Sequence, residues 1–221
     1  MGAGLLGASL VRMIRPVVCV VPLRSPGDGK SRLSPGLDRA ERAELAAAML
    51  SDVIGALRGS AVDRVVVAAS DAAAAAVAAA LDAEVLLDPP GAAGLDAVIA
   101  HAASVVAPAS DLVVVQADLP ALTPADVDAV VAVDGAVVIA PTRDGGTGAL
   151  LRRPADCIPT AFGAGSAAAH RDLARAAGFE PFVLELPGFA TDVDTWADLE
   201  IVVADAGPAT RAFLGRLAEA G

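Results

Sequence analysis

Acidic residues at two distant places in the chain have the types and spacing that bind divalent cations. Asp118 follows an apolar run in the segment QADLP, and Asp192 and Asp194 lie two residues apart in TDVDT. Residues two apart in an extended chain point to the same side, so the second segment presents two carboxylates together. Such like charges repel each other, and a metal ion is a common way to stabilise them. Three carboxylates from two segments match a two-metal phosphoryl-transfer site.

Each acidic segment also has a plain structural interpretation. Asp118 could cap a turn or helix ahead of Thr123 and Pro124, and Asp194 could cap a helix that begins at Thr195. However, Asp118 directly follows a predicted strand, and ligands of open α/β sheets bind beyond the carboxyl ends of the strands. A carboxylate there suits Mg²⁺, which prefers one or two carboxylates together with phosphate oxygens and water. Capping and metal binding therefore both stay open.

A cationic segment, RSPGDGKSRL, runs from Arg24 to Leu33 after the apolar run Val17–Val21. Its Gly-Lys-Ser resembles part of a P-loop, but the P-loop pattern needs glycine where this chain has Arg24. A P-loop also continues directly into a helix, whereas the segment Ser34–Gly36, which contains a proline, interrupts one here. The pattern therefore disfavours a P-loop ATPase and leaves another phosphate-binding loop or an ordinary solvated loop.

Two glycine-containing segments could bind an anion. In PTRDGGTG the glycines let the backbone approach a phosphate or carboxylate, with the Thr147 hydroxyl as a further donor. A simple hairpin turn is the alternative. In FGAGS, Gly163 and Ser166 precede a helix, whose first N–H groups favour anions, although Ser166 could serve only as its cap.

The two histidines lie within helical patterns and form no legible catalytic motif. Neither His101 nor His170 belongs to a Ser-His-Asp, Cys-His or metal-ligand pattern. We interpret His101 as structural. His170 lies one turn after Ser166, so a supporting role at that position is the hypothesis.

The elements that must position these residues alternate between short Val-rich strands and longer helices, which indicates βαβ units and a mainly parallel sheet. The predicted strands are Val17–Val21, Arg64–Ala69, Ala83–Leu87, Leu112–Gln116, Ala136–Ala140, Thr147–Leu151 and Pro181–Leu186. The predicted helices run from Asp38 to near Gly59 and over Asp71–Leu81, Leu95–Val106, Pro124–Val133, Ser166–Ala177, Thr195–Ala204 and Pro208–Ala220. Asp38 and Glu41 form a predicted capping box.

These elements predict an α/β protein with a single domain. The 221 residues suit a single domain, which we place at 16–221, behind a disordered N-terminal extension at 1–15. Met13 is an alternative start of translation. The extension lacks the order of charges and the cleavage site of a secretory signal.

The amino-acid composition limits the classes of binding partner and the cellular location that we expect. A net charge of −11 argues against nucleic-acid and anionic-membrane binding, because both favour a basic surface. No uncharged apolar stretch is long enough for a transmembrane helix, although 55% of the residues are hydrophobic. Cys19 and Cys157 lie far apart, as in a reducing cytoplasm, where we expect the protein. An acidic protein that binds a polyphosphate must concentrate its cations locally or use metal ions.

The segments RSPGDGKSRLSP, QADLPALTP, TRDGGTGALL, FGAGSAAAH and PGFATDVDTWADL occur together in this order. With them, nearly the whole chain from Val17 onward resembles the guanylyltransferases of deazaflavin coenzyme F(420) biosynthesis. The resemblance implies a nucleotide-diphospho-sugar transferase (GT-A-like) fold with a Rossmann-like mixed sheet. It also implies transfer of GMP from GTP to phosphoenolpyruvate, with release of pyrophosphate. 2-Phospho-L-lactate and 3-phosphoglycerate are alternative acceptors, and a downstream transferase of the same pathway is a possible partner.

The resemblance also implies roles for individual residues. Asp118, Asp192 and Asp194 would bind Mg²⁺, as two ions, and Thr147, Gly163 and Ser166 would hold the acceptor. Lys30 and Arg32, supported by Arg24, would bind the triphosphate, so Lys30, Arg32 and Asp118 form the expected catalytic set. Asp96 occupies a nucleotide-contact position at which the family often has asparagine. Arg24 replaces a common lysine, which keeps the charge and changes the contact geometry.

Two other functions stay open from the sequence. A nucleotidyltransferase acting on a sugar phosphate or molybdopterin would share the fold, but those enzymes usually carry a longer first loop with a double glycine, which VVPLRSPGDGK lacks. A noncatalytic nucleotide-binding module is the alternative from another class. The presence of three acidic positions together with Lys30 and Arg32 favours an enzyme over that module.

Overall fold

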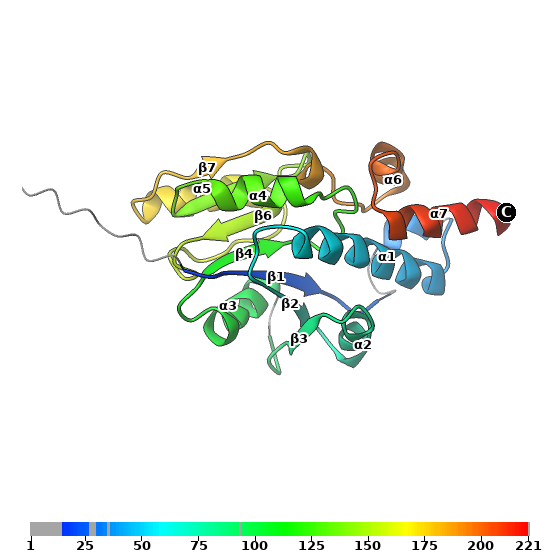
Figure 1. Cartoon of the computed structure of the whole chain (residues 1–221), viewed down its shortest axis with the longest axis horizontal. Helices are drawn as coiled ribbons and strands as arrows, with labels where there is room; N and C mark the ends of the chain where they lie inside the picture. Colours follow the sequence, from blue (N-terminus) through cyan, green and yellow to red (C-terminus); the bar gives the residue numbers. More distant parts are fainter. Residues whose placement is uncertain (1–14, 27–29, 35, 93, 221) are drawn as a thin grey trace, which may run out of the picture.

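A computed structural model describes residues 15–26, 30–34, 36–92 and 94–220. Its centre is a seven-stranded sheet with the order β3-β2-β1-β4-β6-β5-β7 (Figure 1). The strands are β1 (Val17–Leu23), β2 (Arg64–Ala69), β3 (Glu84–Leu87), β4 (Asp111–Val115), β5 (Val137–Pro141), β6 (Thr147–Arg152) and β7 (Phe182–Val183). Only β6 is antiparallel to its neighbours, so the sheet is mixed and mainly parallel, as predicted.

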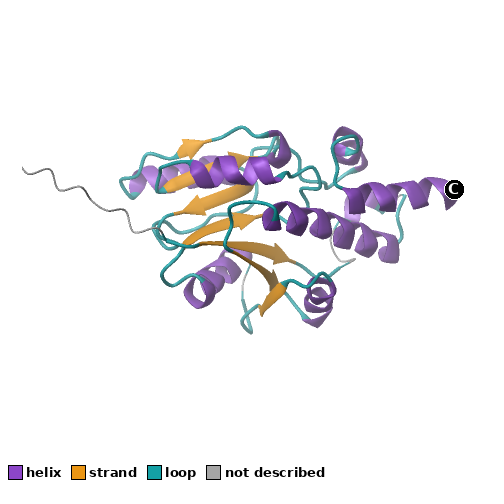
Figure 2. Ribbon diagram, viewed as in Figure 1, coloured by secondary structure: helices purple, strands orange, loops and turns teal. Residues whose placement is uncertain are grey.

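Helices cover both faces of this sheet (Figure 2). The helices are α1 (Arg39–Arg58), α2 (Ala72–Ala80), α3 (Leu95–Val106), α4 (Pro124–Ala132), α5 (Ser166–Ala176), α6 (Trp196–Val202) and α7 (Pro208–Ala220), with short 3-10 helices η1 (Ser31–Leu33) and η2 (Pro187–Phe189). One apolar core joins α1, α2 and α4 to the sheet, while α3 and α5 cover the opposite face. Helices α1, α6 and α7 share a further apolar cluster, and α7 lies beside α1 (Figure 1).

Side-chain caps fix where α1, α4 and α6 begin. The predicted capping box of α1 is confirmed, because Asp38 accepts from the Glu41 N–H and the Glu41 carboxylate accepts from the Asp38 N–H. The same arrangement begins α4 at Thr123 and α6 at Thr195. These caps hold the loops that enter the helices, including the loop that carries Asp194.

Most element boundaries agree with the sequence prediction to within one or two residues, and the last strand differs most. The prediction placed a strand over Pro181–Leu186, but β7 covers only Phe182–Val183. Leu184 still donates its N–H to the Ile139 carbonyl, after which Pro187 begins η2. This strand lies at the sheet edge with a single neighbour, so few backbone pairs hold it.

The described part of the chain contains no helix that combines the length and the apolar character needed to cross a membrane. The predicted extension at 1–15 lies outside the described residues except for Arg15. The predicted single domain at 16–221 stays a prediction.

Candidate active site

The antiparallel strand β6 brings two predicted site segments together at the carboxyl ends of the parallel strands. β1 and β4 are parallel neighbours, so the chain leaves both strands at the same end of the sheet. Because β6 runs in the opposite direction, it begins at the end of the sheet where β1 and β4 finish. There the Gln116 N–H donates to the Gly148 carbonyl. Thr147 therefore lies beside the segment that carries Asp118. Open α/β sheets bind ligands beyond the carboxyl ends of their strands, which is where these segments lie.

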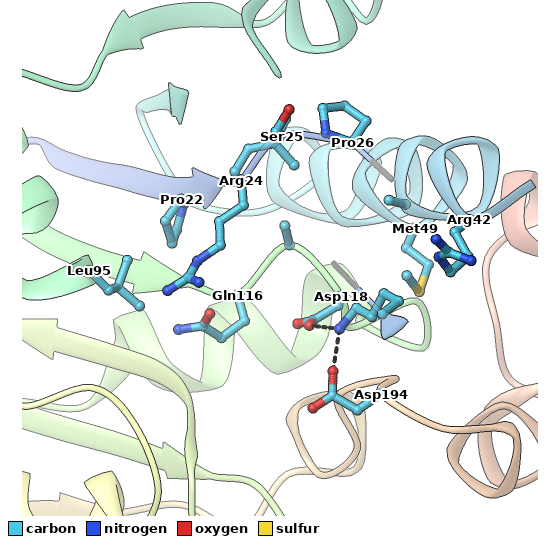
Figure 3. Close-up of a pocket in the computed structure, with 14 residues that line it drawn as sticks. Pro22, Arg24, Ser25, Pro26, Arg42, Met49, Leu95, Gln116, Asp118 and Asp194 are labelled. Carbon is cyan, nitrogen blue, oxygen red and sulfur yellow. Dashed lines mark hydrogen bonds and ion pairs between the residues drawn. The ribbon is translucent and has the colours of Figure 1, made fainter. Parts of the chain in front are cut away.

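Lys30 connects the cationic loop to two of the three predicted metal ligands. Its ammonium donates to Asp118 and, at 2.8 Å, to Oδ1 of Asp194. Dashed lines in Figure 3 mark both contacts. The Lys30 side chain is 13% exposed, and burial lowers its pKa, but the charges and hydrogen bonds of Asp118 and Asp194 outweigh that effect and raise the pKa above its ordinary value. The ammonium is therefore held in its charged form.

The Lys30 backbone is in a left-handed conformation, with φ of 58°. Non-glycine residues rarely adopt this conformation, and such residues concentrate at functional sites. The conformation directs the chain from the cationic loop into η1, whose Leu33 is fully buried. Lys30 is thus positioned by its backbone as well as by its carboxylate partners.

A backbone contact explains how the segment TDVDT reaches Asp118. The Val193 N–H donates to the Asp118 carbonyl at 3.0 Å, and the Val193 side chain is fully buried in the cluster of α1, α6 and α7. Asp194 does not cap α6, since the side-chain cap is Thr195. Likewise Thr123, and not Asp118, caps α4. The interpretation of these two aspartates as helix caps is therefore wrong, and both carboxylates bind Lys30.

Asp192 lies where negative charge is poorly compensated. Burial, followed by the charges of Asp118, Asp144 and Asp194, raises the pKa of Asp192 from its ordinary 3.8 to about 6. Like charges raise a carboxyl pKa because ionisation adds to the repulsion. A cation near Asp192 would relieve this repulsion.

The donor set fits a divalent cation in its chemistry. The negative charge of Asp192 adds to those of Asp118 and Asp194, and one positive group, the Lys30 ammonium, pairs with both Asp118 and Asp194. Among the described residues, no group of three or more His, Cys, Asp or Glu side chains is arranged as ready-made metal ligands. A metal ion held by Asp118 and Asp194 would therefore share these carboxylates with Lys30 or displace it.

A cavity of about 260 Å³ lies between the cationic loop and these carboxylates. Its lining includes Arg24, Lys30, Gln116, Asp118 and Asp194. The guanidinium of Arg24 extends toward Gln116 (Figure 3). Arg24 and Lys30 thus line the same cavity, and the triphosphate contact of Arg24 stays a prediction.

Arg32 is placed differently from the other two cations. It is exposed on η1 and does not line this cavity. Its predicted role in binding the triphosphate stays a prediction, and it would require the side chain to reach over the cavity mouth.

Two of the predicted acceptor residues contact each other. The hydroxyls of Thr147 and Ser166 lie 2.8 Å apart, and both residues are buried. Gly163 is exposed and has φ of +138°, a conformation that requires glycine. The first N–H groups of α5 are partly used within the protein, because Ser166 donates to the Gly163 carbonyl and Ala167 donates to the Gly145 carbonyl. The Ser166 hydroxyl is therefore a better candidate for an anion than these amides.

Asp96 contacts the acceptor loop rather than the wall of the cavity. Its Oδ1 accepts the Phe162 N–H at 3.0 Å and so connects the first turn of α3 to the residue before Gly163. A carboxylate can make this contact, and it needs no amide donor. The predicted nucleotide contact of Asp96 stays a prediction, while the structure gives this residue a contact with the acceptor loop.

Sequence reasoning did not single out Gln116, which lines the cavity, or Asp144, which adds to the negative charge at Asp192. Gln116 directly follows β4, and its position at the strand end was a signal available in the sequence. Asp144 is paired with Thr142 and the Gly146 N–H in the turn before Thr147. That turn geometry was not legible from the residue order.

Comparison with known proteins defines the class first. A crystal structure of a putative nucleotide-diphospho-sugar transferase from Desulfovibrio desulfuricans G20 matches with a TM-score of 0.74 at 18% identity, over 90% of this chain and 94% of that chain. Together with the sheet order, this match confirms the predicted nucleotide-diphospho-sugar transferase fold. In this chain the fold carries a carboxylate-rich site beyond the carboxyl ends of β1 and β4.

The family follows from the sequence as a whole. The model of the family described as "Guanylyl transferase CofC like" matches residues 17–219, and the chain belongs to this family. A protein named phosphoenolpyruvate guanylyltransferase from Conexibacter woesei is 38% identical over 214 residues, which cover 90% of this chain and 95% of the relative. One named 3-phospho-D-glycerate guanylyltransferase from Phenylobacterium zucineum is 36% identical over 208 residues, with 90% and 95% covered. The prediction of a nucleotidyltransferase is confirmed.

Proposed function

We propose that the protein transfers GMP from GTP to phosphoenolpyruvate, with release of pyrophosphate, to give enolpyruvyl-diphospho-guanosine for coenzyme F(420) biosynthesis. The observation that carries this proposal is the convergence of Lys30, Asp118 and Asp194 beside the cavity at the ends of β1 and β4, in a member of the guanylyl transferase family. The name of the Conexibacter relative supports phosphoenolpyruvate as the acceptor.

The reaction needs little acid–base catalysis. A phosphate oxygen of the acceptor attacks the α-phosphorus of GTP, and the bond from that phosphorus to the bridging oxygen breaks as pyrophosphate leaves. The attacking group is already an anion, so no general base is required. The barrier lies mainly in bringing two anions together, which makes charge neutralisation and positioning the main contributions of the protein.

The nucleotide side of the site uses the cations and carboxylates around the cavity. In the proposal, Lys30 and Arg24 contact the triphosphate, and Arg32 contributes charge from the cavity mouth. Asp118, Asp192 and Asp194 would hold Mg²⁺, which when bound supplies positive charge for the triphosphate. Lys30 then has two possible anionic partners, the carboxylates and the nucleotide.

The acceptor side uses the segments beside β6 and α5. Thr147 and Ser166 supply hydroxyls, and Gly163 lets the backbone approach the acceptor without a side chain in the way. A phosphorylated three-carbon acid has both carboxylate and phosphate oxygens for such donors. 2-Phospho-L-lactate and 3-phosphoglycerate share these groups, and the name of the Phenylobacterium relative supports the second as an alternative.

The test is pyrophosphate release with GTP, Mg²⁺ and each of the three acceptors in turn. We expect the largest kcat/KM with phosphoenolpyruvate, and little activity when ATP, CTP or UTP replaces GTP. A preference for another acceptor would revise the substrate and keep the enzyme class. If no acceptor and no nucleotide supports pyrophosphate release, a nucleotidyltransferase acting on a sugar phosphate or a noncatalytic nucleotide-binding module would be favoured instead.

The cellular location of the protein and its downstream partner are part of the same proposal. Both cysteines are free, which agrees with a reducing cytoplasm as the place of action. The product would pass to a transferase of the same pathway. A pull-down of that transferase from the native host, and location of the tagged protein in cell fractions, would test these two points.

A further inference from the structure

A chain of hydrogen bonds runs beneath the predicted acceptor residues and passes through His170. The Ala161 N–H donates to Nε2 of His170 at 3.0 Å, and Nδ1 of His170 lies 3.1 Å from Oγ1 of Thr147. Oγ1 of Thr147 lies 2.8 Å from Oγ of Ser166. His170 itself is fully buried. One imidazole therefore touches the loop before Gly163, the start of β6 and, through Thr147, the start of α5.

The partner of Nε2 decides the tautomer of His170. Nε2 accepts a backbone N–H, so in the neutral ring the proton is on Nδ1. Nδ1 then donates to Oγ1 of Thr147. The Phe162 ring also packs against the imidazole in a T-shaped arrangement, with centroids 4.8 Å apart and planes at 69°, which restricts rotation of the imidazole. The direction of this donation is thus fixed by the loop.

Counting donors shows that the chain of hydrogen bonds has one hydrogen to spare. Four donors take part, namely the Ala161 N–H, the Nδ1–H of His170 and the hydroxyls of Thr147 and Ser166. Among the described residues they form three contacts. One hydroxyl hydrogen is left over, whichever way the hydroxyls of Thr147 and Ser166 donate to each other. A buried donor without an acceptor is unfavourable, and an anionic oxygen is its best partner.

We propose that His170 is a positioning residue for the acceptor: it holds Thr147, Ser166 and the loop before Gly163 so that the spare hydroxyl hydrogen meets a carboxylate or phosphate oxygen of the acceptor. This inference rests on the proposed function and assigns a role to a residue that touches neither substrate. Asp96 holds the same loop by accepting the Phe162 N–H. The imidazole and the Asp96 carboxylate together restrain consecutive residues of the acceptor loop.

The test compares His170→Phe with His170→Gln by steady-state kinetics of pyrophosphate release. Phenylalanine keeps an aromatic ring but neither accepts from Ala161 nor donates to Thr147, whereas glutamine can do both through its amide. We expect His170→Phe to raise the KM for the acceptor about tenfold or more, with the KM for GTP nearly unchanged, and His170→Gln to recover most of the loss. His101→Phe, at the other histidine and on α3, is the matched control and should leave both KM values unchanged.

The outcomes separate this inference from the proposed function. An unchanged acceptor KM in a folded His170→Phe variant would overturn the inference alone, as would an equal rise of both KM values, which indicates general loss of structure. If His170→Phe does not fold, His170→Asn replaces it, because its shorter amide can still donate to Thr147 but loses the contact with the Ala161 N–H, and we expect a smaller rise of the acceptor KM with the KM for GTP unchanged. Inactivity of the unaltered protein with all three acceptors would overturn the proposed function and this inference with it.

Discussion

Lys30 and Asp118 lie 88 positions apart in the sequence and form an ion pair beyond the carboxyl ends of β1 and β4. The same ammonium reaches Asp194, 164 positions from Lys30. One side chain thereby gathers the cationic loop after β1, the segment after β4 and the loop before α6. The pairing makes Lys30 part of the carboxylate cluster as well as a candidate partner of the nucleotide.

Replacing Lys30 should remove most of the activity. Lys30→Met takes away the ammonium and keeps the length of the side chain, so we expect kcat/KM for GTP to fall by about 10²-fold or more. The reason is the loss of the cation nearest to Asp118 in the cavity. Pyrophosphate release at varied GTP measures the effect.

Arg64→Met is the matched control for Lys30→Met. Arg64 forms an ion pair with Glu84 on the exposed surface, and its side chain is 43% exposed. We expect full activity from this variant. Equal losses in the two variants, or none in Lys30→Met, would show that Lys30 has no special role.

Asp118→Asn and Asp192→Asn should both abolish activity but differ in stability. Asp118 is a partner of Lys30, and its neutralisation leaves the largely buried Lys30 ammonium with Asp194 as its charged partner. Asp192 faces other carboxylates, so its neutralisation relieves repulsion. We expect urea denaturation to show a lower free energy of unfolding for Asp118→Asn and an equal or higher one for Asp192→Asn. Retained pyrophosphate release in both variants would contradict the metal-ligand assignment.

His170 should make the protein less stable as the pH falls from about 7 toward 4. Burial lowers the pKa of His170 from its ordinary 6.5 to about 4, so the native state stays neutral where the unfolded state takes up a proton. The unfolded state then binds more protons, and the free energy of unfolding falls by at most about 1.4 kcal/mol per pH unit from this group.

Denaturation of the unaltered protein and of His170→Gln at several pH values between about 7 and 4 isolates this contribution. The difference between the two should shrink or change sign as the pH falls, because glutamine does not titrate. Parallel curves for the two proteins would mean that the pKa of His170 is the same in the native and unfolded states.

The buried pair of Asp111 and Arg153 should matter for stability and not for catalysis. Nε of Arg153 donates to Oδ2 of Asp111 at 2.8 Å, and the side chains are only 10% and 8% exposed. Asp111→Asn leaves the Arg153 charge uncompensated, and we expect a loss of about 3–5 kcal/mol in the free energy of unfolding. The pair lies at the start of β4, at the opposite end of that strand from Asp118.

Glu84→Gln gives the exposed counterpart of Asp111→Asn, since it breaks an ion pair whose side chains are both exposed. A loss of about 1 kcal/mol or less is expected there. Chemical denaturation measures both variants, and kcat for each should match the unaltered protein under conditions in which it is folded. Similar losses in the two variants would mean that burial of the Asp111 pair contributes little.

The sequence by itself determined the alternation of strands and helices, because apolar runs, capping residues and glycines act over a few neighbours. The capping box at Asp38 and the strand that precedes Asp118 are examples, and both were legible as local patterns. The order of the motifs also identified the family, which the match over residues 17–219 confirms. The site residues proposed from that resemblance remain predictions to be tested by the variants above.

Only the tertiary structure decided which of these residues meet. The pairing of β6 against β4 places Thr147 beside the segment of Asp118, and the backbone contact of Val193 with Asp118 brings in Asp192 and Asp194. It also left Arg32 outside the cavity and placed His170 under Thr147. Contacts of this kind depend on strand order and burial over the whole chain, so local patterns of residue type could not specify them.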